Sequence, residues 1–170
     1  MMFKKLQKFF GAEPHPSMQW PQLEIQTPAF QTSTRAVADL TFGSGIDGAM
    51  MFGAPDEVRP LDGGGVNLVY AKAGFQLEFD QDSLTCVAFF VSKDEYQPDT
   101  PGLTHCEPIV DGHKFGPSHS PAQVQDLLGA PKSVDEDEDE TILDYERNGL
   151  TLEFEFTAAG ALKRLSLFHA

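Results

Sequence analysis

The hydrophobic pattern of this chain indicates two sets of short strands. The segments GFQLEFD (residues 74–80) and GLTLEFEF (149–156) both alternate apolar with polar side chains. Such a period of two is typical of a strand that buries one face and exposes the other. Apolar segments flank each of them: VNLVYA (66–71) and LTCVAFFV (84–91) in the first set, and TILDYE (141–146) and ALKRLSLF (161–168) in the second. Because the connections are short, and one contains the hairpin pair Asn148-Gly149, the pattern predicts two three-stranded antiparallel meanders.

A short helix is predicted in front of each meander. In SPAQVQDLLGAP (120–131), Ser120 and Gln123 have the spacing of a capping box, and the final Gly-Ala-Pro is typical of a helix end. The apolar stripe of this helix is formed by Val124, Leu127 and Leu128. The segment SGIDGAMMFGAP (44–55) repeats the pattern, but its two internal glycines predict a shorter or less regular helix.

These elements predict an α+β fold of two tandem repeats, each a short helix followed by a three- or four-stranded antiparallel meander. We divide the chain into a basic amphipathic N-terminal segment and connector (1–28), repeat unit one (29–92), a linker that contains prolines and a glycine (93–104) and repeat unit two (105–170). A further strand is expected before each helix, within 35–42 and 107–115. The pattern leaves open whether the two meanders form one continuous sheet.

The repeated unit resembles a known protein-binding scaffold. The helix endings FGAP (52–55) and LGAP (128–131), an aromatic strand with a tyrosine, a glycine hairpin and a phenylalanine-rich strand are similar to the unit shared by the outer-membrane assembly lipoprotein BamE and the tandem-repeat beta-lactamase inhibitory protein. The resemblance covers most of 42–90 and 115–168. It implies a binding protein, such as a small acidic immunity protein, rather than an enzyme. The chain departs from these relatives because it has neither a lipidated cysteine near its start nor cysteines paired within a unit.

Charge narrows the choice of partner. The sequence has 26 Asp and Glu residues against 12 Lys and Arg, which gives a formal net charge of −14. Such a chain repels nucleic acid and anionic lipid and attracts a basic protein. The N-terminal segment MMFKKLQKFFGAE (1–13) combines lysines with apolar residues, so it fits either a helix that caps the domain or a weak membrane-surface helix. Because neither a secretory signal nor a disulfide framework is found, we expect a cytoplasmic protein.

The run DEDEDE is the densest charged feature of the sequence. Its carboxylates, which lie between the helix and the strands of unit two, are Asp135, Glu136, Asp137, Glu138, Asp139 and Glu140. Three interpretations stay open: a solvated, self-repelling loop, a docking patch for a basic partner, and a metal site. The spacing argues against calcium, because an EF-hand loop places its ligands at alternate positions and needs a central glycine.

The polar sides of the two alternating strands predict a second acidic surface. Glu78 and Asp80 in unit one, and Glu153 and Glu155 in unit two, should face solvent. Arg164 is expected beside Glu153, where an exposed ion pair would contribute at most about 1 kcal/mol. Together with the DEDEDE run, these four carboxylates form the predicted partner-binding set. We expect its partner to be a basic protein and expect no cofactor, while the oligomeric state stays open.

Catalytic and metal sites find little support in the pattern. His105, Cys106, His113 and His119 are of the right type for zinc, but none has the tight spacing of a zinc-finger pair. No phosphate loop, nucleophile elbow or dinucleotide fingerprint occurs, so we expect no enzyme, no catalytic residue and no bound metal. Two alternatives remain. One is a small hydrolase that uses the His105–His119 region, and the other is a structural or envelope-assembly module anchored by its N-terminal basic helix.

Overall fold

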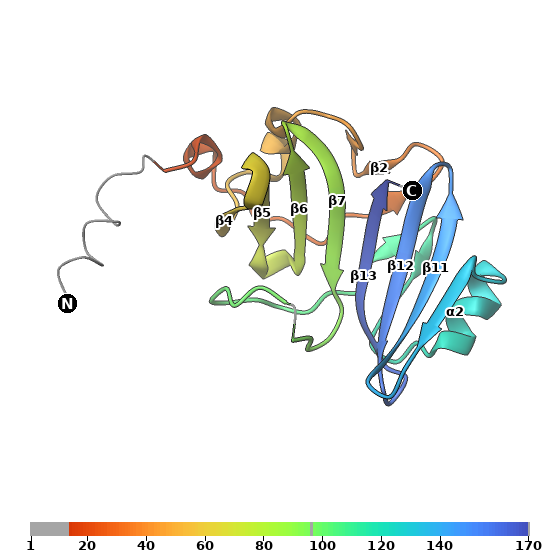
Figure 1. Cartoon of the computed structure of the whole chain (residues 1–170). Helices are drawn as coiled ribbons and strands as arrows, with labels where there is room; N and C mark the ends of the chain where they lie inside the picture. Colours follow the sequence, from red (N-terminus) through yellow and green to blue (C-terminus); the bar gives the residue numbers. More distant parts are fainter. Residues whose placement is uncertain (1–13, 96, 170) are drawn as a thin grey trace.

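A single eight-stranded antiparallel sheet dominates the fold (Figure 1). The computed structural model describes residues 14–95 and 97–169 of the chain. The strands run across this sheet in the order β10-β11-β12-β13-β7-β6-β5-β4. Their bounds are β4 Glu57–Pro60, β5 Val66–Tyr70, β6 Phe75–Asp80, β7 Ser83–Phe90, β10 Ser133–Glu136, β11 Glu140–Arg147, β12 Leu150–Thr157 and β13 Leu162–His169.

The two meanders are joined at the centre of this sheet by β7 and β13. These strands pair antiparallel, with Val87 opposite Leu167 and Cys86 opposite Phe168. A separate meander would leave unpaired backbone groups at both of its edges, and the β7–β13 pairing satisfies one edge of each meander. The prediction of two α+β repeats, each a short helix with its own small meander, is therefore wrong. Most of the regular structure is strand, arranged in one large sheet and one small sheet.

The second sheet has five strands of two residues each, in the order β3-β2-β1-β8-β9. Its strands are β1 Phe30–Gln31, β2 Ala36–Val37, β3 Leu40–Thr41, β8 Ile109–Val110 and β9 His113–Lys114. Both regions in which a further strand was expected, 35–42 and 107–115, contribute to it. Phe30 of β1 pairs in parallel with Val110 of β8, although the two are far apart in the sequence. The segments that precede the two predicted helices thus meet in one sheet.

The two predicted helices differ in kind. The second is the α-helix α2, Pro121–Leu128, and its capping box between Ser120 and Gln123 is confirmed. Of its predicted stripe, Val124 is fully buried, but Leu127 is 42% exposed. The first is a 3-10 helix, η2, Ile46–Phe52. A Cβ on its internal Gly48 would lie 2.7 Å from Leu40 Cδ1, so close packing on the small sheet accounts for a glycine there.

Three further 3-10 turns are present, and the segment after each predicted helix contains an edge strand. The turns are η1 Pro16–Gln19, η3 Asp62–Gly64 and η4 Ala71–Ala73. The edge strands are β4, which pairs with β5, and β10, which pairs with β11. Asp and Glu have low strand propensity, so pairing with a neighbouring strand decides the structure of β10 against its local preference.

The hydrophobic core lies on one face of the large sheet. Residues of η2, α2 and the small sheet belong to the same buried cluster as the apolar strand residues. The rings of Tyr70 and Phe75 stack with centroids 4.8 Å apart. Tyr70 donates its hydroxyl to the carbonyl of Gly53, and Tyr145 donates to that of Gly129, each the residue that follows a helix. Both tyrosines therefore pack in the core, and each hydroxyl ties a helix end to the sheet.

Candidate functional site

The other face of the large sheet carries most of the predicted site residues. Directly paired residues in antiparallel strands share a face, so the register defines a continuous row across all eight strands. That row contains Glu57, Val69, Gln76, Ala88, Ser166, Glu153, Asp144 and Ser133. Glu78 and Glu155 lie in the rows on either side of it, opposite Cys86 and Arg164. We call this surface the polar face.

The predicted site residues fall into three groups along this sheet rather than one patch. Glu78 and Asp80 lie on β6, Glu153 and Glu155 on β12, and the DEDEDE run on β10, the following turn and the start of β11. Strands in a sheet are about 4.8 Å apart, so three strand spacings separate the first two groups by about 14 Å. Five spacings put β6 about 24 Å from β10. A partner that contacts all three groups would have to span most of the sheet.

Glu155 differs from its prediction because it is buried. It is only 3% exposed, and both of its carboxylate oxygens accept hydrogen bonds from Arg164, at 2.5 and 2.7 Å. The expected partner of Arg164 was Glu153, but the register places Glu155 opposite Arg164 and Glu153 opposite Ser166. Glu155 is therefore part of a buried ion pair and is not available to a partner protein.

The segment between β7 and β8 packs at one end of the polar face and brings a second carboxylate to this ion pair. Asp94 lies 3.6 Å from Lys163 Nζ and 3.4 Å from Arg164 Nη1. Farther along, Thr100 accepts a hydrogen bond from Arg59 and donates one to Glu57. The predicted linker thus packs against the sheet and contributes side chains to it.

Glu153 is the least compensated carboxylate at the centre of the polar face. Burial raises its pKa to about 7, and the neighbouring carboxylates of Glu155 and Asp144 add to the rise, while Arg164 opposes it. Burial and Asp80 also raise the pKa of Glu78. Near neutral pH, Glu153 is therefore only partly charged, and the centre of the polar face is less acidic than its sequence suggests.

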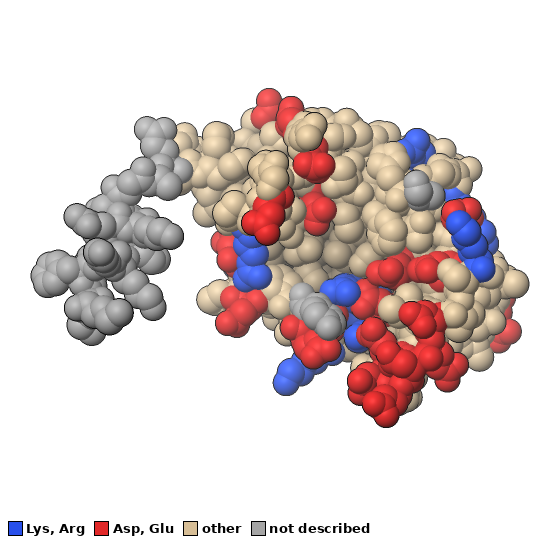
Figure 2. Space-filling model, in the orientation of Figure 1, with Lys and Arg blue, Asp and Glu red and all other residues tan. Residues whose placement is uncertain are grey.

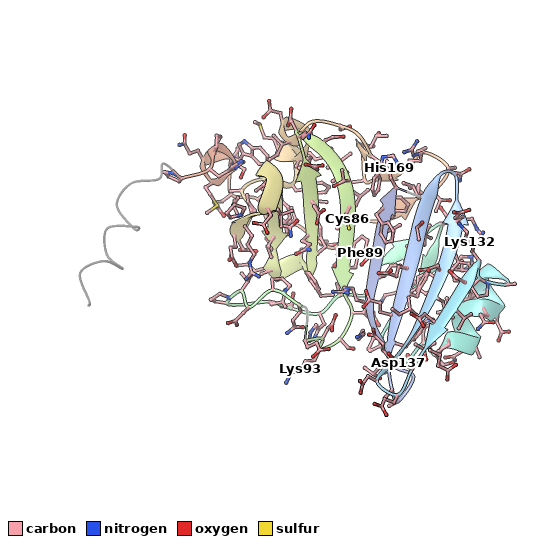
Figure 3. All side chains as sticks on the ribbon, in the orientation of Figure 1. Cys86, Phe89, Lys93, Lys132, Asp137 and His169 are labelled. Atoms are coloured by element: carbon pink, nitrogen blue, oxygen red, sulfur yellow. The ribbon has the colours of Figure 1, made fainter. Side chains whose placement is uncertain are left out.

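Cys86 lies on the same face, in the middle of β7 (Figure 3). Burial raises the pKa of its thiol to about 12, with Glu78 and Glu153 contributing in the same direction. The reactive form of a cysteine is the thiolate, so this thiol is a poor nucleophile at neutral pH. Cys86 and Cys106 are both free cysteines.

The most exposed acidic surface lies at the β10 end of the sheet, where Asp137 marks the turn between β10 and β11 (Figure 3). We define the acidic turn as Asp135, Glu136, Asp137, Glu138 and Asp139, all of which are exposed. Acidic side chains gather at this end in Figure 2. Within 14–95 and 97–169, no Lys or Arg forms an ion pair with these five residues.

Two carboxylates of the DEDEDE run have structural roles that set them apart from the rest. Asp137 accepts hydrogen bonds from the backbone N–H groups of Asp139 and Glu140, at 2.8 and 2.9 Å, which lowers its pKa. Glu140 is only partly exposed and binds Lys163 Nζ at 2.6 Å. Asp137 therefore holds the turn in one conformation. The carboxylates of Asp135, Glu136, Glu138 and Asp139 make no hydrogen bond to the described part of the chain.

The residues considered for metal binding or hydrolysis lie in separate surroundings. His105 contacts Gln97, His113 lies exposed on β9, and His119 bonds to the backbone of Gly116. Among the described residues, no three His, Cys, Asp or Glu side chains are grouped so that they could hold a metal ion. A shallow depression of about 280 Å³ beside His119 is lined by Gln123, Asp126 and Leu127.

A groove that the sequence did not indicate runs beside β4, the opposite edge of the sheet. Its volume is about 880 Å³, and residues of η1 form one wall while β4 and the following loop form the other. Met18, Val58 and Leu61 supply apolar surface, and Asp56 and Glu57 lie in the same lining. No sequence pattern predicted this groove, because no strand was expected within 57–60 and its other wall comes from a distant segment.

No helix among residues 14–95 and 97–169 combines the length and the apolar character needed to cross a bilayer. The N-terminal segment 1–13, for which we predicted either a capping helix or a membrane-surface helix, lies outside the described residues. The alternative of an anchored envelope module therefore stays a prediction.

Comparison with known proteins shows a likeness of fold. No protein-family model matches the chain, and a search of curated proteins found no match. Among solved structures, the chain is similar to the crystal structure of a DUF4309 family protein, YjgB, from Bacillus subtilis subsp. subtilis str. 168, with 15% sequence identity and a TM-score of 0.50. The likeness covers 79% of this chain and 84% of that chain. The resemblance to BamE and the inhibitory protein stays a prediction, and at this level of identity YjgB is similar to the chain in fold alone.

Proposed function

We propose that this protein is a non-catalytic binding protein, of the immunity or inhibitor type, that binds a basic partner protein through its acidic turn. The observation that carries the proposal is the exposure of five successive carboxylates, Asp135 to Asp139, without an ion-pairing Lys or Arg in the described part of the chain. Like charges held this close repel one another, and a partner that supplies cations relieves the repulsion.

The remaining carboxylates of the predicted set contribute less to such binding. Glu155 is neutralised by Arg164, Glu140 is paired with Lys163, and Glu153 has a pKa raised to about 7. The charge available to a partner is therefore concentrated at the β10 end of the sheet, with Asp80 as an exposed but distant site on β6. An asymmetric field of this kind orients a basic partner during encounter and raises the association rate at low salt.

A cytoplasmic location is part of this proposal. Cys86, on β7, and Cys106, in the loop before β8, are free thiols, which fits a reducing compartment. Cys106 is buried and donates its Sγ–H to the carbonyl of Gly74, as expected of a structural thiol.

The test compares two variants that remove equal charge from different places. The first replaces the four acidic-turn carboxylates that make no hydrogen bond to the turn (Asp135→Asn, Glu136→Gln, Glu138→Gln, Asp139→Asn). The matched control neutralises four exposed and scattered carboxylates (Glu24→Gln, Asp39→Asn, Asp62→Asn, Asp99→Asn). Asp137 stays in place because it holds the turn.

The probe is the hexapeptide Lys-Val-Lys-Val-Lys-Val, and its association rate is followed between about 50 and 500 mM salt. We expect the acidic-turn variant to associate about ten-fold more slowly at low salt and to lose most of the salt dependence. The control variant should keep most of the association rate at low salt and most of its salt dependence. Equal loss in the two variants would show that the overall charge, and not the acidic turn, attracts the peptide, and the proposal would be abandoned.

A further inference from the structure

The outer edge of β10 deepens the proposed function, on which this inference rests. β10 is the last strand of the large sheet, and all four of its residues, Ser133–Glu136, are exposed. It pairs on one side only, with β11. In an edge strand, alternate backbone N–H and C=O groups point away from the sheet, so β10 presents donors and acceptors to which a further strand could bond.

The two faces of β10 offer different side chains to such a strand. Asp135 pairs with Ile142, which is opposite the buried Glu155, so Asp135 lies on the polar face. Val134 pairs with Leu143, which is fully buried, so Val134 lies on the core face. Val134 is nevertheless 54% exposed, because no strand covers it on the outer side. Glu136 pairs with Thr141, which is opposite the buried Phe156, so Glu136 also lies on the core face, next to the turn. An added strand would therefore meet Asp135 on the polar face, and the uncovered Val134 followed by Glu136 on the core face.

We propose that an extended basic segment of the partner protein adds to β10 as a ninth strand. Its Lys or Arg side chains lie on the polar face beside Asp135 and the acidic turn, and its alternate apolar side chains cover Val134 on the core face. Backbone hydrogen bonds to β10 hold the segment, while Asp135 on the polar face and Val134 on the core face select its side chains.

Charged edge strands also have a protective role, because they prevent copies of a protein from pairing edge to edge. That role is compatible with this proposal. The carboxylates of β10 repel a second copy of the same edge and any other acidic strand, and they admit a basic one. The acidic edge thus distinguishes the partner from the protein itself.

The first experiment separates strand addition from simple charge attraction. Three peptides are compared: the alternating hexapeptide Lys-Val-Lys-Val-Lys-Val, the same peptide with every lysine amide N-methylated, and the same peptide with every valine amide N-methylated. All three have the same charge and side chains. In an extended segment, the lysine and valine amides point to opposite sides, so only one set can bond to β10.

We expect one methylated peptide to bind about ten-fold more weakly than the parent, and the other to change by less than about three-fold. Equal affinity of the two methylated peptides would overturn strand addition. The proposed function would survive that result if the parent peptide still associates more slowly with the acidic-turn variant than with the control variant. If the parent shows no salt-dependent binding at all, both ideas fail together.

The second experiment changes the edge strand itself. Val134→Lys removes the apolar contact and introduces a positive charge that repels the lysines of the peptide. Val134→Thr keeps a β-branched side chain and serves as the control. Because Val134 is on the surface, both variants should fold. We expect Val134→Lys to bind the parent peptide about ten-fold more weakly and Val134→Thr to bind within about three-fold. Hydrogen exchange should show that the peptide protects alternate amides within 133–136, and protection of none of them would refute the placement.

Discussion

Replacing Arg164 tests how much of the stability of the sheet depends on the buried ion pair. Its guanidinium makes two hydrogen bonds to Glu155, at 2.5 and 2.7 Å, and lies 3.4 Å from Asp94. The Glu155 and Asp94 side chains are 3% and 1% exposed, and that of Arg164 is 21% exposed. Arg164→Met keeps most of the side-chain volume but leaves two buried carboxylates with less compensation.

The expected loss can be worked out from these surroundings. Removing one partner of a buried ion pair costs about 3–5 kcal/mol. Lys163 Nζ remains 4.0 Å from Glu155 and compensates part of the lost charge. We therefore expect the lower end of that range, about 3 kcal/mol, which for a chain of this size corresponds to a fall in Tm of about 6–12 °C.

The assay is urea unfolding of four proteins: the wild type, Arg164→Met, Glu155→Met and the double variant. A buried pair replaced on both sides by apolar groups leaves no charge unpaired, so the double variant should recover more than half of the loss. Two results would refute this reasoning. One is a loss of less than about 1 kcal/mol in Arg164→Met, and the other is a double variant as unstable as the sum of the single variants.

Three further predictions concern the polar face, the helix and a hairpin. The pKa of Glu153 is about 7 in the folded protein against the usual 4.5, so the wild type loses stability as the pH rises between these values. Because Glu153→Gln does not titrate, its stability relative to the wild type should rise by about 1 kcal/mol from about pH 5 to pH 8 in urea titrations, a value reduced for the partial exposure of the side chain. A stability difference that is independent of pH would contradict this prediction. Ser120→Ala removes the cap bond to Gln123 and should lower the free energy of unfolding by about 1 kcal/mol, with Ser120→Asp as a control that keeps a cap. Gly74→Ala should lower the Tm more than Gly149→Ala. Both glycines have φ near +75°, but only an added Cβ at Gly74 would meet a backbone oxygen, that of Thr104 at 2.7 Å. Equal losses of Tm would show that the positive φ alone determines the loss.

Local features of the fold were predictable because they depend on neighbouring residues. The capping box at Ser120 needs only the spacing to Gln123, and it forms as expected. Asn148 and Gly149 both adopt the positive φ that a tight hairpin requires. The alternation of GLTLEFEF likewise fixes which side chains face the core, since the period of two is a property of the strand itself.

The large-scale arrangement was not predictable because it depends on contacts between distant segments. No sequence period and no turn signal indicates the β7–β13 pairing or the parallel pairing of Phe30 with Val110. The choice of Glu155 rather than Glu153 as the partner of Arg164 depends on strand register, which also shifts between Glu155 and Phe156. A difference of one paired row decides whether a carboxylate is exposed or buried, and sequence patterns do not resolve register at that level.

The two ends of the large sheet differ in what they would offer to a further strand under the proposed strand addition. At the β4 end, Glu57 is paired with Arg59, Asp56 is paired with Lys72, and Pro60 lacks a backbone N–H. At the β10 end, the acidic turn has no such compensation in the described residues. A head-to-tail contact between copies would have to bring the uncompensated edge against one already neutralised, gaining no charge attraction and losing a backbone bond at the proline. Under the proposed strand addition, a basic strand from another protein meets neither obstacle at β10, and the carboxylates that would attract it also disfavour pairing with the β10 edge of a second copy.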